Sequence, residues 1–451
     1  MSPDADLHRF LLDLRWDDIP RPAQDRGRLL LLDLLGTAIA GTGTALHQSV
    51  LRYARRNLSG GRARVLFSDA TLSPEGAALV GGMTIDAIDS HDGHRLTKGH
   101  VGCGLLPALL AALDDSGRRI AGTEFLTLLA AGYEIGSRAG IALHATVPDY
   151  HTSGAWSAVN CAAISGHVMG LGPEAFAHAL GIAEYHGPRS QMMRVIAHPT
   201  MLKDGSGWGA MAGVSAAYLA AEGFTGAPAV TVLAPEVAPI WKSLGRDWEV
   251  MNQYVKGFPV CRWAQPAVQA ALDLVESHAP SADEIDAVEV HSFAEAIALC
   301  RRVPETTEEA QYAIGWPLAA ALVRRRIGVA EVSDGAFEDA ALREMLGRIR
   351  YVEDAAMNAR FPAERFAVLR LRLRSGAWIE TGWTTAKGDP ETAFGTAEMV
   401  DKFYRLGGDV CSRDRLDRIH GAVMGLDGGT GSFETLLSEM FAAPRQGRRA
   451  D

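Results

Sequence analysis

One short segment of the chain concentrates side chains that can transfer protons. Residues 89–100, which read DSHDGHRLTKGH, contain three of the 14 histidines, and nine of the 14 lie between positions 91 and 198. A carboxylate beside an imidazole moves its pKa across the neutral range, as general acid–base catalysis requires. A lone loop histidine is more often a hydrogen-bonded structural residue, whereas a cluster favours chemistry. The segment therefore predicts a proton-transfer site that includes Asp89, His91, Asp92, His94 and His100.

Later segments carry groups that suit an anion. Tyr150 and His151 stand in YHTSG, which follows a turn and begins a helix, so that hydroxyls and backbone N–H groups point to one place. Lys203 precedes a Gly-rich helix start in MLKDGSG, a second anion-binding arrangement, although a solvated loop lysine explains the local sequence equally well. Between them, Arg189 and Arg194 either clamp a carboxylate with paired hydrogen bonds or stay on the surface.

Helices must position these groups, because the chain up to about residue 266 reads as one helix after another. The predicted helices are rich in Ala and Leu, with short Gly or Pro breaks between them: Asp25–Gly41, Gly76–Ile88, Leu105–Leu113, Thr123–Leu143, Trp156–Met169, Ala175–Tyr185, Ala210–Gly223 and Ala264–His278. Helices that are apolar on several sides form a buried bundle, and the last two contain so much Ala and Gly that they must pack closely on neighbours. No internal repeat is found.

The pattern changes after residue 266 and predicts a second domain of α+β type over residues 267–392. Its expected strands and helices are Ala287–Phe293, Glu308–Ile327, Asp334–Arg348, Arg350–Glu353, Phe366–Arg374 and Trp378–Thr384. The last two segments alternate apolar and polar residues around Ser375-Gly376, which is typical of a hairpin. Helical character returns from Thr396 to Leu437, so residues 393–451 are expected to rejoin the helical domain of residues 1–266.

Composition excludes several classes of protein. A chain of 451 residues exceeds one hydrophobic core, which favours two domains. The net charge of −10 disfavours binding to nucleic acid. The five cysteines form no C-x-x-C pair, which favours reduced thiols. With an acidic start and only a short apolar run at Leu29–Gly41, the sequence predicts a cytoplasmic protein with no membrane partner.

Several further blocks follow one another along nearly the whole chain. They are LLDLLG at 31–36, AIDSHDGHRLTKGH at 87–100, LPA at 106–108, GYE at 132–134, HALGIA at 178–183, GFTG at 223–226, FPVCR at 258–262, AQY at 310–312, KGDP at 387–390 and KF at 402–403. In this order they resemble the MmgE/PrpD family, which includes 2-methylcitrate dehydratase, cis-aconitate decarboxylase and iminodisuccinate epimerase. The resemblance implies a mainly α homodimer with a large all-helical domain, a smaller α+β lid, and an active site between them.

The resemblance also implies roles for individual residues. Asp89, His100, His151 and Lys203 match family active-site positions, and the family acts on small polycarboxylates without a metal or organic cofactor. A proton beside a carboxylate is weakly acidic, so its removal needs a positioned base and stabilisation of the carbanion. His100 or His151 would be that base, while Lys203 holds carboxylates and Asp89 orients a histidine. We therefore expect a lyase that dehydrates or decarboxylates a polycarboxylate; epimerisation through the same proton abstraction is the alternative.

The chain departs from the family pattern near the expected pocket. The family block D-F-D-D-T-H stands here as DSHDGH, so His91 replaces a carboxylate and Gly93 replaces a threonine. Gln265 stands where a histidine is frequent, and Trp316 where a tyrosine is frequent. Because of these departures, the family pattern does not identify which polycarboxylate is the substrate. The predicted substrate-binding residues are His91, Asp92, His94, Tyr150, Arg194 and Trp316.

Two other classes of protein compete with a cofactor-free lyase. The Asp and His side chains of residues 89–100 are potential metal ligands, and an adjacent His-Asp pair also occurs in HD-type metallohydrolases. The segment reads as a loop without i, i+4 ligand spacing, so no metal is predicted. A catalytically inactive binding protein could keep the same fold, but the joint presence of Asp89, His100, His151 and Lys203 favours catalysis. Nucleotide enzymes are disfavoured, because no Gly-rich phosphate motif follows a strand.

Overall fold

Ala- and Leu-rich segments form the helices of a large domain in the computed structural model, which describes residues 3–428 and 431–444. Its first helices and strands are α1 (Pro3–Asp13), α2 (Arg21–Gly41), α3 (Ala45–Asn57), β1 (Ala63–Arg64), β2 (Thr71–Leu72), α4 (Pro74–Asp86), β3 (Asp92–His94), α5 (Gly102–Ser116), α6 (Gly122–Thr146), α7 (Gly154–Met169), α8 (Pro173–His186), α9 (Met192–Ala197), α10 (Ser206–Ala221), α11 (Val230–Leu233), α12 (Ala238–Trp241) and β4 (Gln253–Val255). Every helix predicted before residue 250 is confirmed. Among the described helices, none alone is long and apolar enough to cross a membrane, and by length and composition only the bent pair α2–α3 would be.

Small residues set the distance between helices in this domain. A Cβ on Gly82 of α4 would lie 2.6 Å from the Gly207 Cα of α10, so the two backbones touch. On the other side of α10, a Cβ on Gly213 would lie 2.4 Å from the carbonyl oxygen of Ala158 in α7. The close packing predicted for the Ala- and Gly-rich helix is therefore confirmed, and it fixes the start of α10 directly after Lys203.

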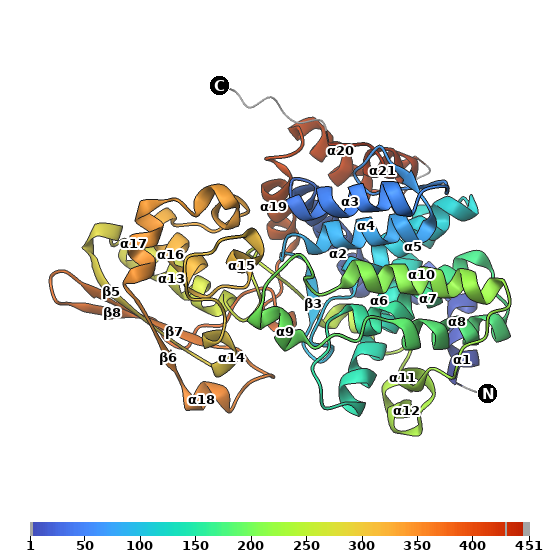
Figure 1. Cartoon of the computed structure of the whole chain (residues 1–451), viewed down its shortest axis with the longest axis horizontal. Helices are drawn as coiled ribbons and strands as arrows, with labels where there is room; N and C mark the ends of the chain where they lie inside the picture. The colour runs from blue at the N-terminus through green and yellow to red at the C-terminus, as the bar shows by residue number, and fades with distance from the viewer. Residues whose placement is uncertain (1–2, 429–430, 445–451) are drawn as a thin grey trace.

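The last helices of the chain pack against the first ones. They are α19 (Thr396–Gly407), α20 (Arg413–Met424) and α21 (Ser432–Met440), and Figure 1 draws them in red beside blue α2 and α3. Phe403 packs on Gly36, where a Cβ would lie 3.1 Å from the Phe403 ring. The buried Lys402 ammonium lies 2.5 Å from Asp33 Oδ1. Residues 445–451 of the predicted third segment lie outside the described residues.

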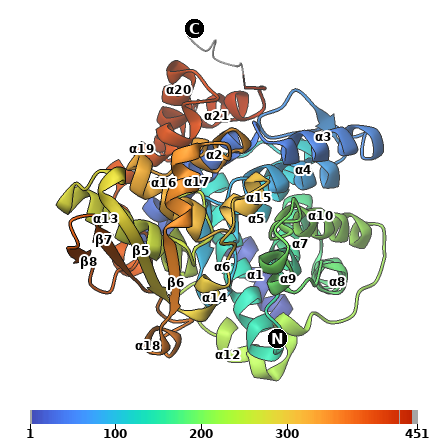
Figure 2. The same cartoon turned by 60° about the vertical axis from the view of Figure 1, so that its left-hand side comes forward.

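Residues between these two parts of the helical domain form the α+β domain, which extends to one side (Figures 1 and 2). Its elements are α13 (Gln265–His278), β5 (Ile285–Ser292), α14 (Ala294–Ile297), α15 (Thr307–Gln311), α16 (Gly315–Arg324), α17 (Ala340–Gly347), β6 (Ile349–Glu353), α18 (Ala355–Asn358), β7 (Ala367–Leu373) and β8 (Trp378–Glu380). The sheet has the order β6-β5-β7-β8, with only β5 and β6 parallel. Its apolar face shares a core with α13, α16 and α17. The predicted β7–β8 hairpin is confirmed.

Two predicted helices of this domain are interrupted. Asp334–Arg348 divides into a 3-10 turn at Asp334–Ala336 and α17, which begins at Ala340. Glu308–Ile327 was expected to be continuous, but α15 ends at Gln311 and α16 begins at Gly315. In the gap, the backbone N–H of Cys300 donates to the Tyr312 carbonyl (3.0 Å), and that of Ile314 donates to the Cys300 carbonyl (3.0 Å). This pairing with a distant segment outweighs local helix propensity. The break turns Gln311 and Tyr312 toward the helical domain.

The chain passes from the helical domain to the α+β domain after Val255 and returns near Gly388, and these two crossing points are in contact. The His-rich segment, predicted to be a loop, contains strand β3, which pairs with β4 so that Gly93 faces Tyr254. The backbone N–H of Val255 donates to the Gly388 carbonyl at 2.9 Å. A Cβ on Gly388 would lie 2.1 Å from the Val255 oxygen, so this close approach requires glycine.

Candidate active site

A small charged pocket lies at the junction of the two domains. Its lining comes from the loops on either side of β3, from β4, from the loops before α7 and α10, from α9 and from the α+β domain: Asp89, Lys98, His100, Tyr150, Met192, Asp204, Tyr254, Lys256, Cys261, Arg262, Trp263, Tyr312 and Arg365. The cavity volume is about 30 Å³, which is the share of liquid volume that one water molecule takes. A larger ligand therefore enters only when some of these residues move apart.

His100 presents one ring nitrogen to this pocket. Its backbone N–H donates to Ser153 Oγ (2.9 Å), and its ring Nδ1 lies 2.5 Å from the carbonyl oxygen of Asp92. Because a carbonyl only accepts, Nδ1 carries the hydrogen and Nε2 keeps its lone pair. Burial, and then the nearby Lys256 ammonium, lower the pKa of His100 to about 3. The ring is therefore neutral near pH 7, with Nε2 available as a proton acceptor.

Asp89 and Lys256 form a buried ion pair beside that nitrogen. The Lys256 ammonium donates to Asp89 Oδ1, and it lies 3.5 Å from His100 Nε2. Burial opposes both charges, but each partner stabilises the other. As a result the pKa of Asp89 lies well below its usual value, and that of Lys256 lies above its own. Lys256 is thus a permanent cation next to the proton acceptor.

Lys203 is joined to Asp89 through Gln311. The Lys203 ammonium donates to Gln311 Oε1 (2.7 Å), and the same oxygen accepts the backbone N–H of Asp89 (2.9 Å). The Lys203 ammonium also lies 4.8 Å from the centre of the Tyr312 ring. Lys203 and Lys98 both have left-handed backbones, with φ of 48° and 52°. Such conformations are sparsely populated for non-glycine residues and concentrate at functional sites.

A second layer of titratable side chains supports His100 from behind. His91 Nδ1 lies 3.2 Å from the same Asp92 carbonyl, and its ring centre is 4.4 Å from that of His100. Its Nε2 lies 3.4 Å from Asp86 Oδ1. Burial raises the pKa of Asp86 and, together with Lys256, lowers that of His91. His91 is therefore uncharged near pH 7, and its ring packs against that of His100 and holds its orientation.

Three further predicted substrate-binding residues lie near this layer. Asp92 is fully buried and accepts the Tyr133 hydroxyl (2.5 Å) and the backbone N–H of Gly102 (3.3 Å), which makes it an anchor for α5 and α6. His94 Nε2 contacts Glu249 Oε2 at 3.1 Å, away from the pocket lining. Tyr150 does line the pocket, and its hydroxyl donates to the carbonyl of Lys98 (2.6 Å).

The other predicted residues lie outside the pocket. His151 forms a backbone bridge with Gln191, and its buried Nδ1 has no hydrogen-bond partner among the described residues. Arg194 lines a separate cavity of about 330 Å³ that borders the Lys203 loop. Trp316 is fully buried in the α+β core, where its indole N–H donates to the Glu331 carbonyl (2.9 Å). Trp316 therefore does not line this pocket, whereas the break after Gln311 places Tyr312 in it.

Asp89, His91 and His100 also have the spacing of metal ligands. Within the described part of the chain, one potential ligand atom from each lies within 4.8 Å of the others. The Lys256 ammonium is already hydrogen-bonded to Asp89 and close to His100. A divalent ion at this position would be repelled by that ammonium. The three side chains therefore fit an internal lysine better than a metal ion.

Sequence reasoning missed several pocket residues. Asp204 directly follows Lys203, and its carboxylate accepts Ser153 Oγ–H (2.8 Å) and the Tyr312 hydroxyl (3.3 Å). Tyr312 and Arg262 stood inside blocks that carried the family resemblance, so their signal was present. Lys256, Tyr254 and Arg365 are isolated residues in polar surroundings, and only the fold brings them together. Gln265, a departure from the pattern, donates to the carbonyls of Phe258 and Val260 (both 3.0 Å) and shapes the loop after Lys256.

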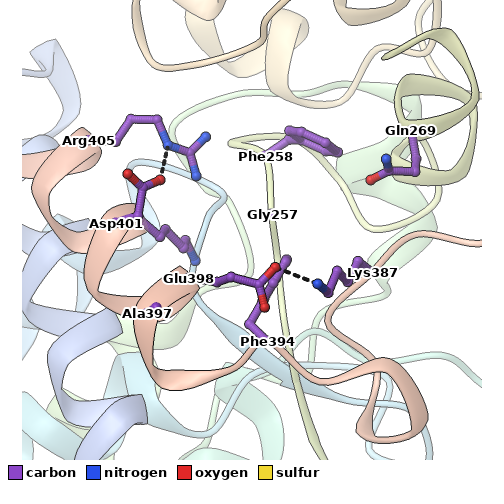
Figure 3. Close-up of a pocket in the computed structure, with 10 residues that line it drawn as sticks. Gly257, Phe258, Gln269, Lys387, Phe394, Ala397, Glu398, Asp401 and Arg405 are labelled. Carbon is purple, nitrogen blue, oxygen red and sulfur yellow. Dashed lines mark hydrogen bonds and ion pairs between the residues drawn. The ribbon is translucent and has the colours of Figure 1, made fainter. Parts of the chain in front are cut away.

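A larger cavity of about 460 Å³ borders the other side of Gly257 and Phe258, between the α+β domain and α19 (Figure 3). Its charged side chains neutralise one another. Glu398 pairs with Lys387, and Asp401 lies 4.0 Å from Arg405, as the dashed lines in Figure 3 mark. No group comparable to His100 lines this cavity in the described structure. The small pocket is therefore the better candidate for catalysis.

Comparison with known proteins identifies the family of the chain. The model of the MmgE/PrpD N-terminal domain matches residues 5–236, and that of the MmgE/PrpD C-terminal domain matches residues 258–427. The cis-aconitate decarboxylase-like protein oryM of Aspergillus oryzae is 23% identical over 94% of each chain. A cis-aconitate decarboxylase of Aspergillus terreus is 30% identical over 40% of this chain and 38% of its own length. With both domain models matched in order across most of its length, the chain belongs to the MmgE/PrpD family.

Proposed function

We propose that this protein is a cofactor-free lyase that removes water or carbon dioxide from a small polycarboxylate. Membership of the family and the cis-aconitate decarboxylase relatives support a lyase of the dehydratase or decarboxylase type. The observation that carries the finer proposal is His100 Nε2, which faces a small pocket with a lysine ammonium 3.5 Å away.

The cationic lining suits a substrate with several carboxylates. Lys98, Lys256, Arg262 and Arg365 line the pocket, against the carboxylates of Asp89 and Asp204. Asp89 is paired with Lys256, and Arg262 lies 2.8 Å from Asp389. Lys98 and Arg365 have no carboxylate partner among the described residues, so they are the cations most available to a ligand.

His100 would transfer the proton in either reaction. In dehydration, Nε2 takes the proton next to a substrate carboxylate, the C–H electrons form the C=C bond, and hydroxide leaves as water with a proton from a pocket acid. In decarboxylation, the C–C bond to a carboxylate breaks, CO₂ leaves, and the carbanion takes a proton that His100 Nε2 has first accepted from solvent water after the bound polyanion raises its pKa. Lys256, with Lys98 and Arg365, stabilises the negative charge that builds on the remaining carboxylate oxygens. Binding a polyanion also offsets the cations that depress the pKa of His100, which strengthens the base when substrate is present.

The test is a substrate panel with NMR detection. Purified protein is incubated in D₂O with 2-methylcitrate, citrate, cis-aconitate and an aspartate-derived diacid. Loss of water or CO₂ from one of them supports the proposal. Deuterium incorporation without either loss would replace it with epimerisation, and no reaction in the whole panel contradicts it. His100→Ala should lower turnover by about 10²–10⁴-fold, whereas His186→Ala, at an exposed position, should leave it unchanged.

A further inference from the structure

Gly93 and Tyr254 face each other across the β3–β4 ladder. A Cβ added to Gly93 would lie 2.4 Å from both Cζ and the hydroxyl oxygen of Tyr254, and 2.7 Å from Cε2. The end of the tyrosine ring therefore occupies the space that any side chain at position 93 would need. This is the position at which the family pattern has threonine and the present chain has glycine. The side chain from the facing strand fills the space beside Gly93.

The Tyr254 ring is held on several sides. Its edge meets His100, with ring centres 6.4 Å apart and planes at 88°. The guanidinium of Arg262 lies 5.0 Å from the ring centre, and that of Arg365 lies 5.9 Å away. Cations over an aromatic face are attracted by its quadrupole. Tyr254 thus links the proton acceptor to two arginines that line the same pocket.

The Tyr254 side chain lines the pocket and is 5% exposed, and its hydroxyl is not used in a hydrogen bond among the described residues, 3–428 and 431–444. The hydroxyl oxygen is not among the fully buried side-chain atoms that lack a partner in the described residues, so it is accessible from the pocket space. Burial raises its pKa to about 12, so the group stays protonated near pH 7 and can donate. A donor at the edge of His100 suits a carboxylate oxygen of a substrate bound there.

We propose that Tyr254 is a substrate-binding residue that donates its hydroxyl to a substrate carboxylate, and that Gly93 is a positioning residue whose missing side chain allows this. The proposal rests on the polycarboxylate function proposed above and extends it by one specific contact. Gly93 and Tyr254 together set the wall of the pocket beside His100. A side chain at position 93 would push the ring into the remaining cavity.

Four variants test the pair: Tyr254→Phe, Tyr254→Ala, Gly93→Ala and the double variant Gly93→Ala with Tyr254→Ala. We measure kcat and KM for the acid that the wild type converts, the Kd for propane-1,2,3-tricarboxylate by calorimetry, and Tm. Tyr254→Phe keeps the ring, so Tm should stay near the wild-type value while KM and Kd rise about tenfold. Tyr218→Phe is the matched control, because its hydroxyl bonds Asp115 at 2.6 Å on a remote helix, and its KM and Kd should not change.

The double variant shows whether Gly93→Ala acts by a clash with the Tyr254 ring or by a general loss of stability. Gly93→Ala should lower both Tm and kcat/KM in the wild type but cost almost nothing further once Tyr254 is alanine, which is a non-additive coupling. Equal costs in both backgrounds, or unchanged KM and Kd in Tyr254→Phe, would overturn the proposal. A wild type that neither converts any acid nor binds the tricarboxylate is a different result. It refutes the polycarboxylate function and the substrate contact. The Tm values of the wild type, the two alanine variants and the double variant would still show whether Gly93 and Tyr254 pack against each other.

Discussion

Lys203 and Asp89 meet at a single atom, the side-chain oxygen of Gln311, which accepts the Lys203 ammonium at 2.7 Å and the backbone N–H of Asp89 at 2.9 Å. The two donors come from different segments of the helical domain, and the acceptor comes from the α+β domain. The amide N–H₂ group of Gln311 is occupied as well, since it donates to the Ala87 carbonyl (3.1 Å) and to Thr307 Oγ1 (2.9 Å). The side-chain amide of Gln311 thus makes four hydrogen bonds, and three of them hold the α+β domain against the helical domain at the site.

Replacing Gln311 with leucine should misalign the site. The Lys203 ammonium and the Asp89 N–H would lose their common acceptor in a buried place, so the free energy of unfolding should fall by about 2 kcal/mol. The kcat/KM should fall at least about tenfold, because one such lost contact is worth about 1.4 kcal/mol. Urea unfolding and steady-state kinetics check this. Gln269→Leu, which loses only a hydrogen bond to Asp273 (2.8 Å) within α13, is the control. Wild-type kcat/KM in Gln311→Leu would show that the alignment is dispensable.

Lys256→Met should be far more damaging than loss of a surface lysine. It leaves the Asp89 carboxylate buried without its partner, which costs about 3–5 kcal/mol. Because the pKa of Asp89 is lowered in the folded protein, the pair stabilises fully above the usual Asp pKa and loses its contribution as pH falls through the lowered value. The difference between wild type and variant should thus be constant near neutral pH and shrink on acidification. Lys387→Met, which breaks the exposed pair with Glu398, should cost about 0–1 kcal/mol. A similar cost for both variants would contradict the assignment.

The titration of His100 should depend on Lys256. In the substrate-free protein its pKa of about 3 means that the ring stays neutral throughout the mildly acidic range. Removing the Lys256 charge in Lys256→Gln removes the second-largest cause of that shift, after burial, so the pKa should rise. Proton NMR of the imidazole resonances against pH measures this directly. The acid limb of kcat/KM that belongs to the base should move to higher pH in the same variant. An unmoved His100 titration in Lys256→Gln would refute the coupling.

Asp92→Asn should remove a pH-dependent loss of stability. Burial raises the pKa of Asp92 to about 6, against the stabilising hydrogen bond from Tyr133. Above the unfolded value the folded protein holds a proton that the unfolded chain has released, so this group makes stability fall as pH rises toward about 6. The difference in unfolding free energy should move in favour of Asp92→Asn by up to about 3 kcal/mol between acidic and neutral pH. Urea unfolding at several pH values tests it, with exposed Asp13→Asn as the control. A pH-independent difference would show that Asp92 titrates normally.

Local periodicity was enough to predict most elements of the fold. The Ala- and Leu-rich helices and the alternating strands of the β7–β8 hairpin formed where apolar spacing placed them. The break between Gln311 and Gly315 was not predictable, because Tyr312 leaves the helix to pair with Cys300, a contact between segments. The same holds for β3, whose partner β4 lies about 160 residues away in sequence.

The candidate site was predictable only where chemistry-bearing residues cluster in sequence. Asp89 and His100 stood in such a cluster, and both line the pocket. Lys256 gave no local signal, although it forms the ion pair with Asp89. Trp316 was predicted to bind substrate from its place in the family pattern. In the structure its indole N–H donates to a backbone carbonyl inside the α+β core, away from the pocket. Residue type indicated which chemistry the chain could support, and only tertiary contacts bring the candidate residues together.

The hydrogen bond between Val255 and Gly388 joins the two chain crossings, so that they would act as one hinge, called the joint below. Rotation about that joint would carry Arg365, Tyr312 and Gln311 away with the α+β domain. Asp89, His100 and Lys256 would stay behind, because Lys256 directly follows the joint and is bound to Asp89. Since the cavity of about 30 Å³ is too small to hold a polycarboxylate, we expect each turnover to include such a rotation. Product would then leave by losing half of its binding groups at once, while the proton-transfer half stays assembled for the next substrate.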